Sequence, residues 1–310
     1  MKVVFFGTSE FAIPALNALM DSPCKVLAVV TQPDRKRGRN LKVSAPPVKA
    51  MAIAHDIPVY QPQDASDAAA AAYLKSLNAD LFVVISFGQI LKENILTIPK
   101  LYSINLHGSL LPAYRGAAPT NWAIINGERV SGVTVIKMNE KMDEGDIILR
   151  HETAIYPEDT NITLTERLAD LGARSLGAAI ALIENGGAVF AKQDSAKATY
   201  APKLKKTDGL IDWNMKACEI HARVRGLLPW PGAYSRYGGR ILKVLKTEIA
   251  GSTGAECARG EVVNIIKGKG IVVRTGAGDL IVQYLQLEGK KVLDADSFVR
   301  GHKIERGYRF

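Results

Sequence analysis

Residues 81–86 read LFVVIS, and the uninterrupted apolar run with which this stretch begins is the clearest fold signal in the chain. A strand with one solvated face alternates apolar and polar residues, whereas a parallel strand covered on both faces is apolar throughout. Comparable runs stand at residues 3–6 and 26–30. Helical patterns of apolar residues lie between these runs, at residues 14–20, 47–55 and 68–77. Strands that alternate with helices predict an α/β fold with a Rossmann-like, doubly wound, mostly parallel sheet.

The same sheet is expected to continue beyond these runs. Residues 103–107 form a fourth candidate strand, and further strands are expected at 132–138 and 147–149. A long helix follows, with a capping residue at 159–160 and the sequence NGG at 185–187 to end it.

The pattern changes after this helix, which predicts a second domain. Residues 190–206 lack periodicity and end in PKLKK, as expected of a basic linker. One helix and then short strand-like runs with Gly-rich turns follow, at residues 215–225, 241–246, 261–266, 271–274 and 279–285. Short strands at this spacing predict a small OB-like β-barrel. We therefore expect an α/β catalytic domain over residues 1–189, the linker over 190–206 and the barrel domain over 207–310.

Composition excludes several classes of protein. Of the 310 residues, 47% are hydrophobic and 23% are charged, which is typical of a soluble globular chain. No apolar run approaches the roughly 18 residues of a membrane span, and the opening KVVFFG is too short for a signal peptide. Cys24, Cys218 and Cys257 are too few and too far apart for a disulfide framework or a cysteine-based zinc site. We expect a cytoplasmic monomer that needs no metal and has no membrane partner.

The net charge favours an anionic partner. It is +9 for the whole chain, and residues 207–310 carry 17 Lys/Arg against 11 Asp/Glu, a net charge of +6. Such an excess favours nucleic acid first and acidic metabolites second. Many soluble proteins are mildly basic, so the charge by itself leaves the partner open.

A dinucleotide or ATP site is not expected. Residues 7–12, after the first predicted strand, read GTSEFA in place of G-x-G-x-x-G, and the chain has no G-x-x-x-x-G-K-[ST] motif. Gly7 is explained by the turn from this strand into the first helix.

A candidate catalytic pair stands at the end of the predicted strand 103–107. Asn105 and His107 are two residues apart, so both side chains are expected on one face of the strand. Gly108 and Pro112 then turn the chain, which puts the pair at the carboxyl end of a strand, where open α/β sheets bind ligands. An amide donor and an imidazole at one point can hold a developing oxyanion and move a proton. A packed structural histidine is the alternative.

A carboxylate completes the candidate set. Residues 142–146 read MDEGD, a polar turn that enters the next strand. Asp143 could orient and charge the imidazole of His107, with Asn105 as a hydrogen-bond donor. A solvated turn or a metal-binding loop would show the same acids.

Several stretches of the chain resemble a known family. The stretches SINLHGSLLPAYRGAAP at 103–119, GVTV at 132–135 and MDEGD at 142–146 are similar to the core signature of the folate-dependent formyltransferases. The resemblance extends over essentially the whole chain, through FFGTSEFA at 5–12, TQPDR at 31–35 and GLLPWPGA at 226–233. These outer stretches point to the branch of the family that acts on aminoacyl-tRNA.

The resemblance implies a reaction and its substrates. A formyl group would pass from 10-formyltetrahydrofolate, as co-substrate, to the α-amino group of methionine on initiator tRNA, for translation initiation. The amine would attack the formyl carbon directly and give a tetrahedral intermediate, whose oxyanion Asn105 and a protonated His107 would stabilise. Asp143 would favour the charged imidazole and help to move the proton of the amine.

The resemblance also assigns residues by position. Asn105, His107 and Asp143 match the catalytic trio of the family without departure. The folate-contacting loop of the family matches Ser109, Leu110, Leu111 and Pro112.

Basic residues are the predicted tRNA contacts. The family inserts a tRNA-recognising loop where this chain carries its basic run at 35–42, and such charges can hold RNA phosphates. With the linker lysines, the predicted set is Arg35, Lys36, Arg37, Arg39, Lys42, Lys203, Lys205 and Lys206. Arg39 and Lys42 are the preferred contacts, and a solvated surface loop is the alternative. Trp213 and Trp230 in the C-terminal domain are expected in its core.

Three other functions stay open from the sequence. A formyltransferase for a small amine, such as an amino sugar nucleotide or glycinamide ribonucleotide, would use the same trio. A hydrolase that deformylates the folate would use it with water as the nucleophile. A protein that only binds RNA on a degenerate enzyme fold is the third. The basic C-terminal residues disfavour the small amine, and the intact trio disfavours the last function.

Overall fold

The computed structural model describes residues 1–37, 42–251 and 257–310. Of the basic residues predicted to contact tRNA, Arg39 lies outside these ranges. The described side chains include that of Arg35 but not those of Lys36, Arg37 and Lys42.

In its described part the chain divides into two compact units, and each is built from separate stretches. The first unit comprises Met1–Pro119, Val130–Ala154 and Thr165–Ala201. The second unit comprises Thr120–Arg129, Ile155–Leu164 and Pro202–Phe310. Of the stretch expected as a linker, residues 190–201 thus group with the first unit and residues 202–206 with the second.

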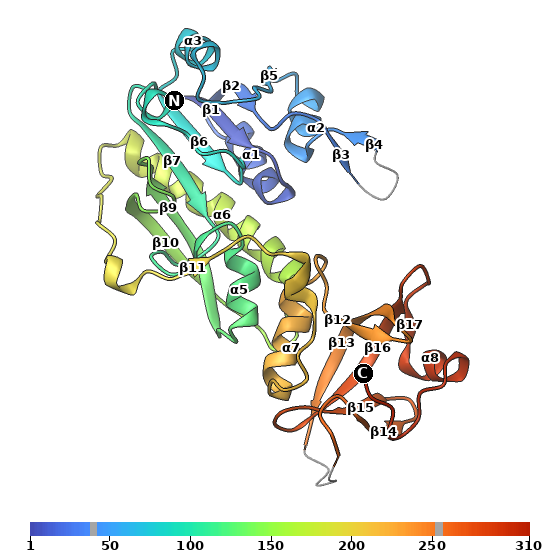
Figure 1. Ribbon diagram of the computed structural model, residues 1–310. Coiled ribbons are helices and arrows are strands. Elements are labelled where there is room, and N and C mark those ends of the chain that lie inside the picture. The colour runs from blue at the N-terminus through green and yellow to red at the C-terminus, as the bar shows by residue number, and fades with distance from the viewer. Residues whose placement is uncertain (38–41, 252–256) are drawn as a thin grey trace. The chain divides into compact units, whose positions relative to one another are not determined.

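The first unit contains a mostly parallel sheet (Figure 1). Its strands are β1 (Lys2–Gly7), β2 (Lys25–Val30), β5 (Val59–Tyr60), β6 (Leu81–Ile85), β7 (Tyr102–His107), β9 (Val130–Lys137) and β10 (Asp146–Ala154). Their order across the sheet is β10-β9-β7-β6-β1-β2-β5. The neighbours from β7 to β5 pair in parallel, whereas β9 and β10 complete one edge as antiparallel strands. A further short parallel pair joins β8 (Arg115–Gly116) to β11 (Tyr200–Ala201).

The helices of this unit begin where the sequence favours a first turn. α1 (Ile13–Met20) and α2 (Pro47–Ala54) carry proline there, where the missing N–H has no intrahelical partner to lose. The side chain of Asp67 caps α3 (Ala68–Ser76) by accepting a hydrogen bond from the N–H of Ala70 at 2.7 Å. The other helical segments are η1 (Glu10–Ala12), α4 (Glu93–Leu96), η2 (Ser195–Lys197) and α6 (Asn161–Glu184), which belongs to this unit from Thr165 on. Among the described helices of the whole chain, none is both long and apolar enough to cross a membrane.

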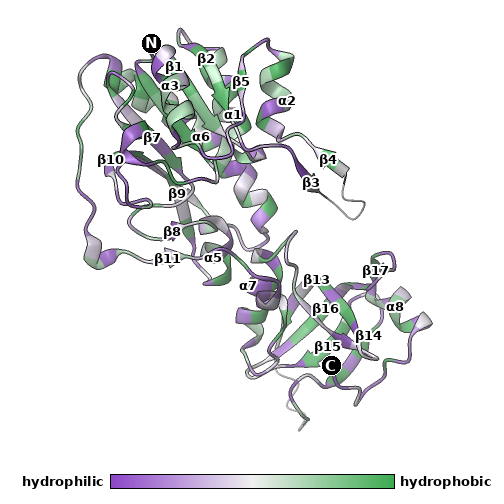
Figure 2. Ribbon diagram, turned by 45° about the horizontal axis from the view of Figure 1, so that its top comes forward, coloured by the Kyte–Doolittle hydropathy of each residue, from purple (hydrophilic) through white to green (hydrophobic). Residues whose placement is uncertain are grey.

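The core of the first unit lies around its central strands, which Figure 2 shows in green for hydrophobic residues. Phe6 of β1 and Phe82 of β6 are buried in one cluster with Leu74 of α3. The ring of Phe6 lies 5.1 Å from that of Phe82 and 5.4 Å from that of Phe87, measured between centroids. All residues of Leu81–Ile85 are buried, which explains why this strand is apolar without alternation.

The second unit contains an antiparallel sheet with the order β12-β13-β16-β15-β14, and β17 beside β16. These strands are β12 (Tyr234–Tyr237), β13 (Arg240–Ala250), β14 (Val262–Ile266), β15 (Gly270–Arg274), β16 (Asp279–Leu287) and β17 (Leu293–Asp294). The helical segments of this unit are α5 (Pro119–Ile125), η3 (Lys206–Gly209), α7 (Ala217–Gly226) and α8 (Ala295–Gly301). Asn121 of α5 donates to the carbonyl oxygen of Gly226 at 2.8 Å, and this bond joins α5 to the end of α7.

The predicted fold class is confirmed, because a mostly parallel sheet is followed by a small antiparallel β unit. The basic run expected as a loop pairs at its ends, where β3 (Arg35–Arg37) and β4 (Lys42–Ser44) form an antiparallel hairpin. Trp213 is buried as expected. The expectation for Trp230 was wrong, since its side chain is 53% exposed. Trp230 lies in a turn between two prolines, outside any helix or strand face that could bury it.

Replacement of Phe82 by alanine is expected to lower the free energy of unfolding by about 3–5 kcal/mol, because the buried ring would leave a cavity in the core. Ile53 of α2 is 57% exposed, so its replacement by alanine serves as the control and is expected to change that free energy by less than about 0.5 kcal/mol. Unfolding in denaturant measures both variants. Equal effects would contradict the assignment of Phe82 to the core.

Candidate active site

The candidate site lies at the carboxyl end of β7. This strand pairs in parallel with β6 and antiparallel with β9, so its backbone is held on both edges. Asn105 and His107 reach the same carboxylate, that of Asp143. The structure therefore places the two side chains on one face of the strand, as their spacing predicts.

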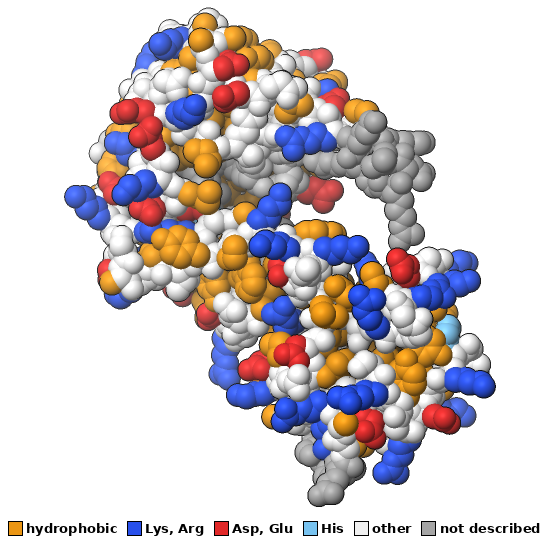
Figure 3. Space-filling view, in the orientation of Figure 1, with side chains coloured by type: hydrophobic (Ala, Val, Ile, Leu, Met, Phe, Trp, Pro, Cys, Tyr) orange, Lys and Arg blue, Asp and Glu red, His pale blue; other side chains and the backbone are white. Residues whose placement is uncertain are grey.

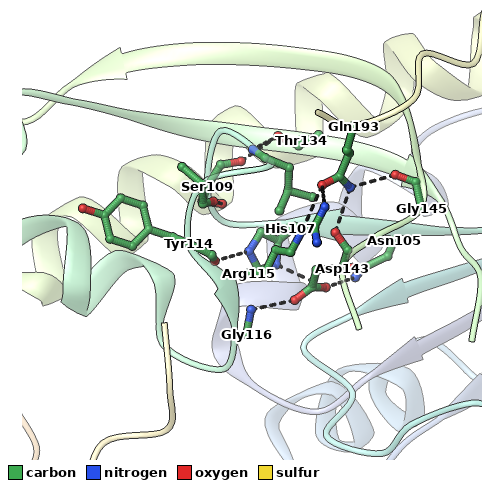
Figure 4. A network of polar contacts seen from close by, with 12 residues as sticks. Asn105, His107, Ser109, Tyr114, Arg115, Gly116, Thr134, Asp143, Gly145 and Gln193 are labelled. Atoms are coloured by element: carbon green, nitrogen blue, oxygen red, sulfur yellow. Dashed lines mark hydrogen bonds and ion pairs between the residues drawn. The ribbon is translucent and has the colours of Figure 1, made fainter. Parts of the chain in front are cut away.

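The carboxylate of Asp143 is at the centre of this site (Figure 4). Its Oδ1 accepts a hydrogen bond from Nδ2 of Asn105 at 3.3 Å and lies 3.6 Å from Nδ1 of His107. Its Oδ2 accepts from the N–H of Gly116 at 2.8 Å. The side chain of Asp143 is 9% exposed and that of His107 is 7% exposed. A carboxylate so far removed from water needs donors, and these neighbours supply them.

The ring of His107 faces an acceptor on each side. Nε2 lies 2.9 Å from the carbonyl oxygen of Tyr114, which can only accept, so this nitrogen carries a proton. Nδ1 faces the carboxylate of Asp143 at ion-pair distance. A ring that is protonated on both nitrogens therefore has an acceptor for each proton. At 3.6 Å the second contact is longer than a hydrogen bond, so Nδ1 is not committed to Asp143 and is left to interact with a substrate oxygen.

The acidic turn, residues 143–145, is tightly constrained. Asp143 has a φ of 56°, in the left-handed region that residues other than glycine seldom occupy. A Cβ on Gly145 would lie 1.9 Å from the carbonyl oxygen of Lys137, so this position admits only glycine. Nε2 of Gln193 donates to the carbonyl oxygens of Asp143 and Gly145, at 2.7 Å and 2.8 Å. The backbone that presents the carboxylate is thus held at both ends.

Arg115 and Gln193 also adjoin the acidic turn, although the sequence predicted no role for either residue. Oε1 of Gln193 accepts from Nε and Nη2 of Arg115, at 3.1 Å and 2.8 Å. Arg115 is 3% exposed, and its Nη1 pairs with the carboxylate of Glu144 at 3.0 Å. Arg115 lies within the family signature at residues 103–119, and this position could have marked it as a site residue. Gln193 offered none, because no local pattern marks a residue that bonds to a turn 50 residues earlier.

The predicted folate-contacting residues differ in burial. Ser109 and Leu111 are buried, whereas Leu110 and Pro112 are half-buried. Oγ of Ser109 donates to a carbonyl of the same loop at 2.6 Å, and Leu111 belongs to a small apolar cluster. Oγ1 of Thr134 braces the loop by donating to the carbonyl oxygen of Ser109 at 2.7 Å and accepting from the N–H of Leu111 at 3.0 Å. Of these four residues, Leu110 and Pro112 keep the more accessible side chains.

The basic residues predicted to contact tRNA are exposed wherever their side chains are described. Arg35 belongs to the first unit and donates to the side chain of Gln32 at 2.9 Å. Lys203, Lys205 and Lys206 belong to the second unit. Figure 3 shows Lys and Arg side chains, in blue, spread over the visible face of that unit.

The acids of the turn have partners other than a metal. Asp143 accepts from Asn105 and Gly116, and Glu144 pairs with Arg115. Among the residues that the structure describes, no group of three or more His, Cys, Asp and Glu side chains could hold a metal ion. These contacts favour proton and charge chemistry at Asp143 over ligation.

The arrangement suits the transfer of an acyl-type group to a nucleophile. Asn105 and His107 present N–H donors beside a carboxylate that can accept a proton. Donors of this kind stabilise the oxyanion of a tetrahedral intermediate. A neighbouring carboxylate can take the proton of an attacking amine.

Two protein-family models match the chain. One, described as Formyl transferase, matches residues 1–180, and the other, described as Formyl transferase, C-terminal domain, matches residues 203–303. The chain belongs to the formyl transferase family. The first match contains Asn105, His107 and Asp143, whereas Gln193 falls between the two matches.

Relatives in this formyl transferase family resemble the chain over its full length. The methionyl-tRNA formyltransferase of Geobacter sulfurreducens is 43% identical over 309 residues, which cover 100% of this chain and 96% of the relative. The methionyl-tRNA formyltransferase of Citrifermentans bemidjiense is 46% identical over 307 residues, which cover 99% and 95%.

Solved structures share the fold at lower identity. A sugar 3N-formyl transferase, WlaRD, superimposes with a TM-score of 0.66 at 20% identity, covering 94% of this chain and 99% of that one. HypX from Aquifex aeolicus, in complex with tetrahydrofolic acid, superimposes with a TM-score of 0.62 at 15% identity, covering 100% of this chain and 51% of that one. At these identities the likeness shows the formyl transferase fold.

Replacement of Gly145 by alanine is expected to lower the free energy of unfolding by about 1–3 kcal/mol, because the new Cβ would overlap a backbone oxygen that cannot move cheaply. Gly177 of α6 has nothing within 4 Å of a built Cβ, so its replacement by alanine is the control and should stabilise the helix slightly. Denaturant unfolding measures both. If the two variants are equally stable, the acidic turn is looser than its contacts indicate.

Proposed function

We propose that this chain transfers the formyl group of 10-formyltetrahydrofolate to the α-amino group of methionine esterified to initiator tRNA. The observation that carries the proposal is the buried carboxylate of Asp143 between the donors of Asn105 and His107, in a chain that resembles methionyl-tRNA formyltransferases over its full length. Transfer RNA is charged and used in the cytoplasm, so we place the reaction there.

The reaction consists of attack by the amine on the formyl carbon and departure of the folate nitrogen N10. The lone pair of the amine forms a bond to the formyl carbon, and the π electrons of the formyl group move onto its oxygen. The attacking nitrogen loses a proton, for which Asp143 is the nearest base in the site. When the intermediate collapses, the bond from the formyl carbon to N10 of the folate breaks, and N10 takes up a proton. The products are a formamide and tetrahydrofolate.

Asn105 and His107 are proposed to hold the oxygen of the intermediate. Asn105 uses one amide proton on Asp143 and has a second to donate, and Nδ1 of His107 lies close to the same carboxylate. In enzymes of this chemistry, loss of one such donor costs about 3–4 kcal/mol of transition-state stabilisation. Asp143 stabilises the positive charge of His107 because its own charge is opposite.

The folate is proposed to lie against the loop from Ser109 to Pro112. The two half-buried side chains of this loop, Leu110 and Pro112, offer apolar contact to a flat ring. Ser109 and Leu111 point into the protein, where they support the loop. On this basis the first unit carries the folate and the chemistry.

The tRNA is proposed to be held by the basic residues of the hairpin β3–β4 and of the second unit. Lys203, Lys205 and Lys206 are exposed at the start of the C-terminal stretch, and the stretch 207–310 adds a net charge of +6. Phosphate contacts of this kind supply affinity and position the RNA without reading its sequence.

A small amine is the less favoured acceptor. The relatives that are 42–46% identical over almost the whole chain are named methionyl-tRNA formyltransferase, whereas sugar formyltransferases share the fold at 20% identity. The net charge of +6 in residues 207–310 also suits a polyanion better than a small substrate.

Replacement of Asp143 by asparagine is expected to lower kcat for formyl transfer at least about 100-fold, because the amide cannot take the proton of the amine. The variant keeps its size and an acceptor for the N–H of Gly116, so the thermal unfolding midpoint should stay close to that of the wild type. Replacement of the exposed Asp170 of α6 by asparagine is the matched control. Near-normal turnover of the Asp143→Asn variant would remove Asp143 from the mechanism.

Binding of methionyl-tRNA is expected to weaken as salt rises from 50 to about 200 mM, because lysines that contact phosphates release counterions. Replacement of Lys203, Lys205 and Lys206 by alanine should reduce the slope of log K against log salt by about one for each lysine in contact. Replacement of Lys75, exposed at the end of α3, is the control. Filter binding measures the slopes, and equal slopes for all proteins would place the RNA elsewhere.

A further inference from the structure

The extended segment after α6 passes directly beside the acidic turn. Ile147, at the start of β10, exchanges two backbone hydrogen bonds with Ala191, at 2.8 Å and 2.9 Å. This bridge anchors the segment two residues before Gln193. Further along, Thr199 accepts from the N–H of Arg115 at 2.9 Å, just before β11 pairs with β8. The segment is therefore tied down on both sides of Gln193.

The amide of Gln193 uses both its donors and its acceptor at this place (Figure 4). Its NH2 group donates to the carbonyl oxygens of Asp143 and Gly145, at 2.7 Å and 2.8 Å. Its oxygen accepts two hydrogen bonds from Arg115, at 3.1 Å and 2.8 Å. Only an amide of this length can donate to a turn on one side and accept from a guanidinium on the other.

Arg115 contacts Glu144, the residue of the turn that Gln193 does not contact. Its guanidinium is almost fully buried and pairs with Glu144 at 3.0 Å. The next residue, Gly116, donates its N–H to Oδ2 of Asp143 at 2.8 Å. Gln193 thus contacts the backbone at both ends of the acidic turn, and Arg115 contacts the side chain of Glu144 in its middle.

We infer that Gln193 is a positioning residue that sets the carboxylate of Asp143 against Asn105 and His107. Asp143 is held in a left-handed conformation, which persists only where the surroundings impose it. Without the two donors of Gln193, the turn can relax and move the carboxylate away from its partners. A displacement of about 1 Å in a catalytic group can lower the rate about 100-fold. The inference rests on the proposed function only where activity is the readout.

Replacement of Gln193 by glutamate tests this role most sharply. Glutamate has the same length and keeps an acceptor for Arg115, but it turns a carboxylate toward two carbonyl oxygens in place of donors. We expect kcat to fall about 10- to 100-fold and KM for both substrates to change less than about threefold. The thermal midpoint should fall less than in Gln193→Ala, because the new carboxylate keeps its contact with Arg115. Gln193→Ala should lower kcat similarly and the midpoint as well. Ser195→Ala, an exposed neighbour on the same segment, is the control and should match the wild type.

A double variant separates positioning from an independent effect. If Gln193 acts through Asp143, Gln193→Glu combined with Asp143→Asn will be no slower than Asp143→Asn by itself. Rate losses that multiply would show that Gln193 acts on something else and would overturn the inference. Normal kcat in Gln193→Glu would overturn it too.

A measurement without substrates keeps the inference testable whatever the reaction is. The ring ¹⁵N resonances of His107, assigned with a His107→Gln variant, report the surroundings of Nδ1. They should shift in Gln193→Glu, because the carboxylate facing Nδ1 has moved, and stay unchanged in Ser195→Ala. Unshifted resonances in Gln193→Glu contradict the positioning role. An inactive wild type whose His107 resonances still respond to Gln193→Glu contradicts the proposed function and supports the positioning role.

Discussion

A carboxylate withdrawn from water is the constraint on which the rest of the site depends. The side chain of Asp143 is 9% exposed, and an ionised group in such a place is costly unless donors replace its hydration. The N–H of Gly116 and the amide of Asn105 replace that water by hydrogen bonds, and the ring of His107 lies at ion-pair distance. The same arrangement keeps a base next to two donors, which is what an amine needs when it attacks a carbonyl group.

Several distant segments have to meet for this constraint to be satisfied. β7 supplies Asn105 and His107, and this strand pairs with β6 on one edge and with β9 on the other. The backbone that carries the two side chains is therefore rigid. The segment of β8 supplies the N–H of Gly116 and the buried guanidinium of Arg115. The chain after α6 supplies Gln193. The cost of the left-handed backbone at Asp143 is offset by these bonds, which is how strained residues persist at functional sites.

Charge and chemistry are distributed differently along the chain. The groups around Asp143 come from the first unit, which carries the mostly parallel sheet. The excess of positive charge is greatest in residues 207–310, most of the second unit. The transfer of a formyl group from a folate to an aminoacyl-tRNA requires both features, because the groups around one carboxylate cannot by themselves hold a large polyanion.

The central strands of the sheet and the shared face of Asn105 and His107 could be predicted from the sequence, because burial on both faces and a spacing of two residues are local patterns. The bounds of the edge strands could not, since β10 runs over Asp146–Ala154 where only 147–149 was expected. The acidic turn at residues 142–146 also marked Asp143 as a candidate, and resemblance to known formyltransferases then assigned it to the catalytic trio. Tertiary packing is what brings Gln193, in a stretch without periodicity, to the acidic turn and leaves Trp230 exposed. It also decided that α5 groups with the second unit from Thr120 on. Periodicity reports how one element is buried, whereas hydrogen bonds between residues 50 or more positions apart exist only once the chain has packed.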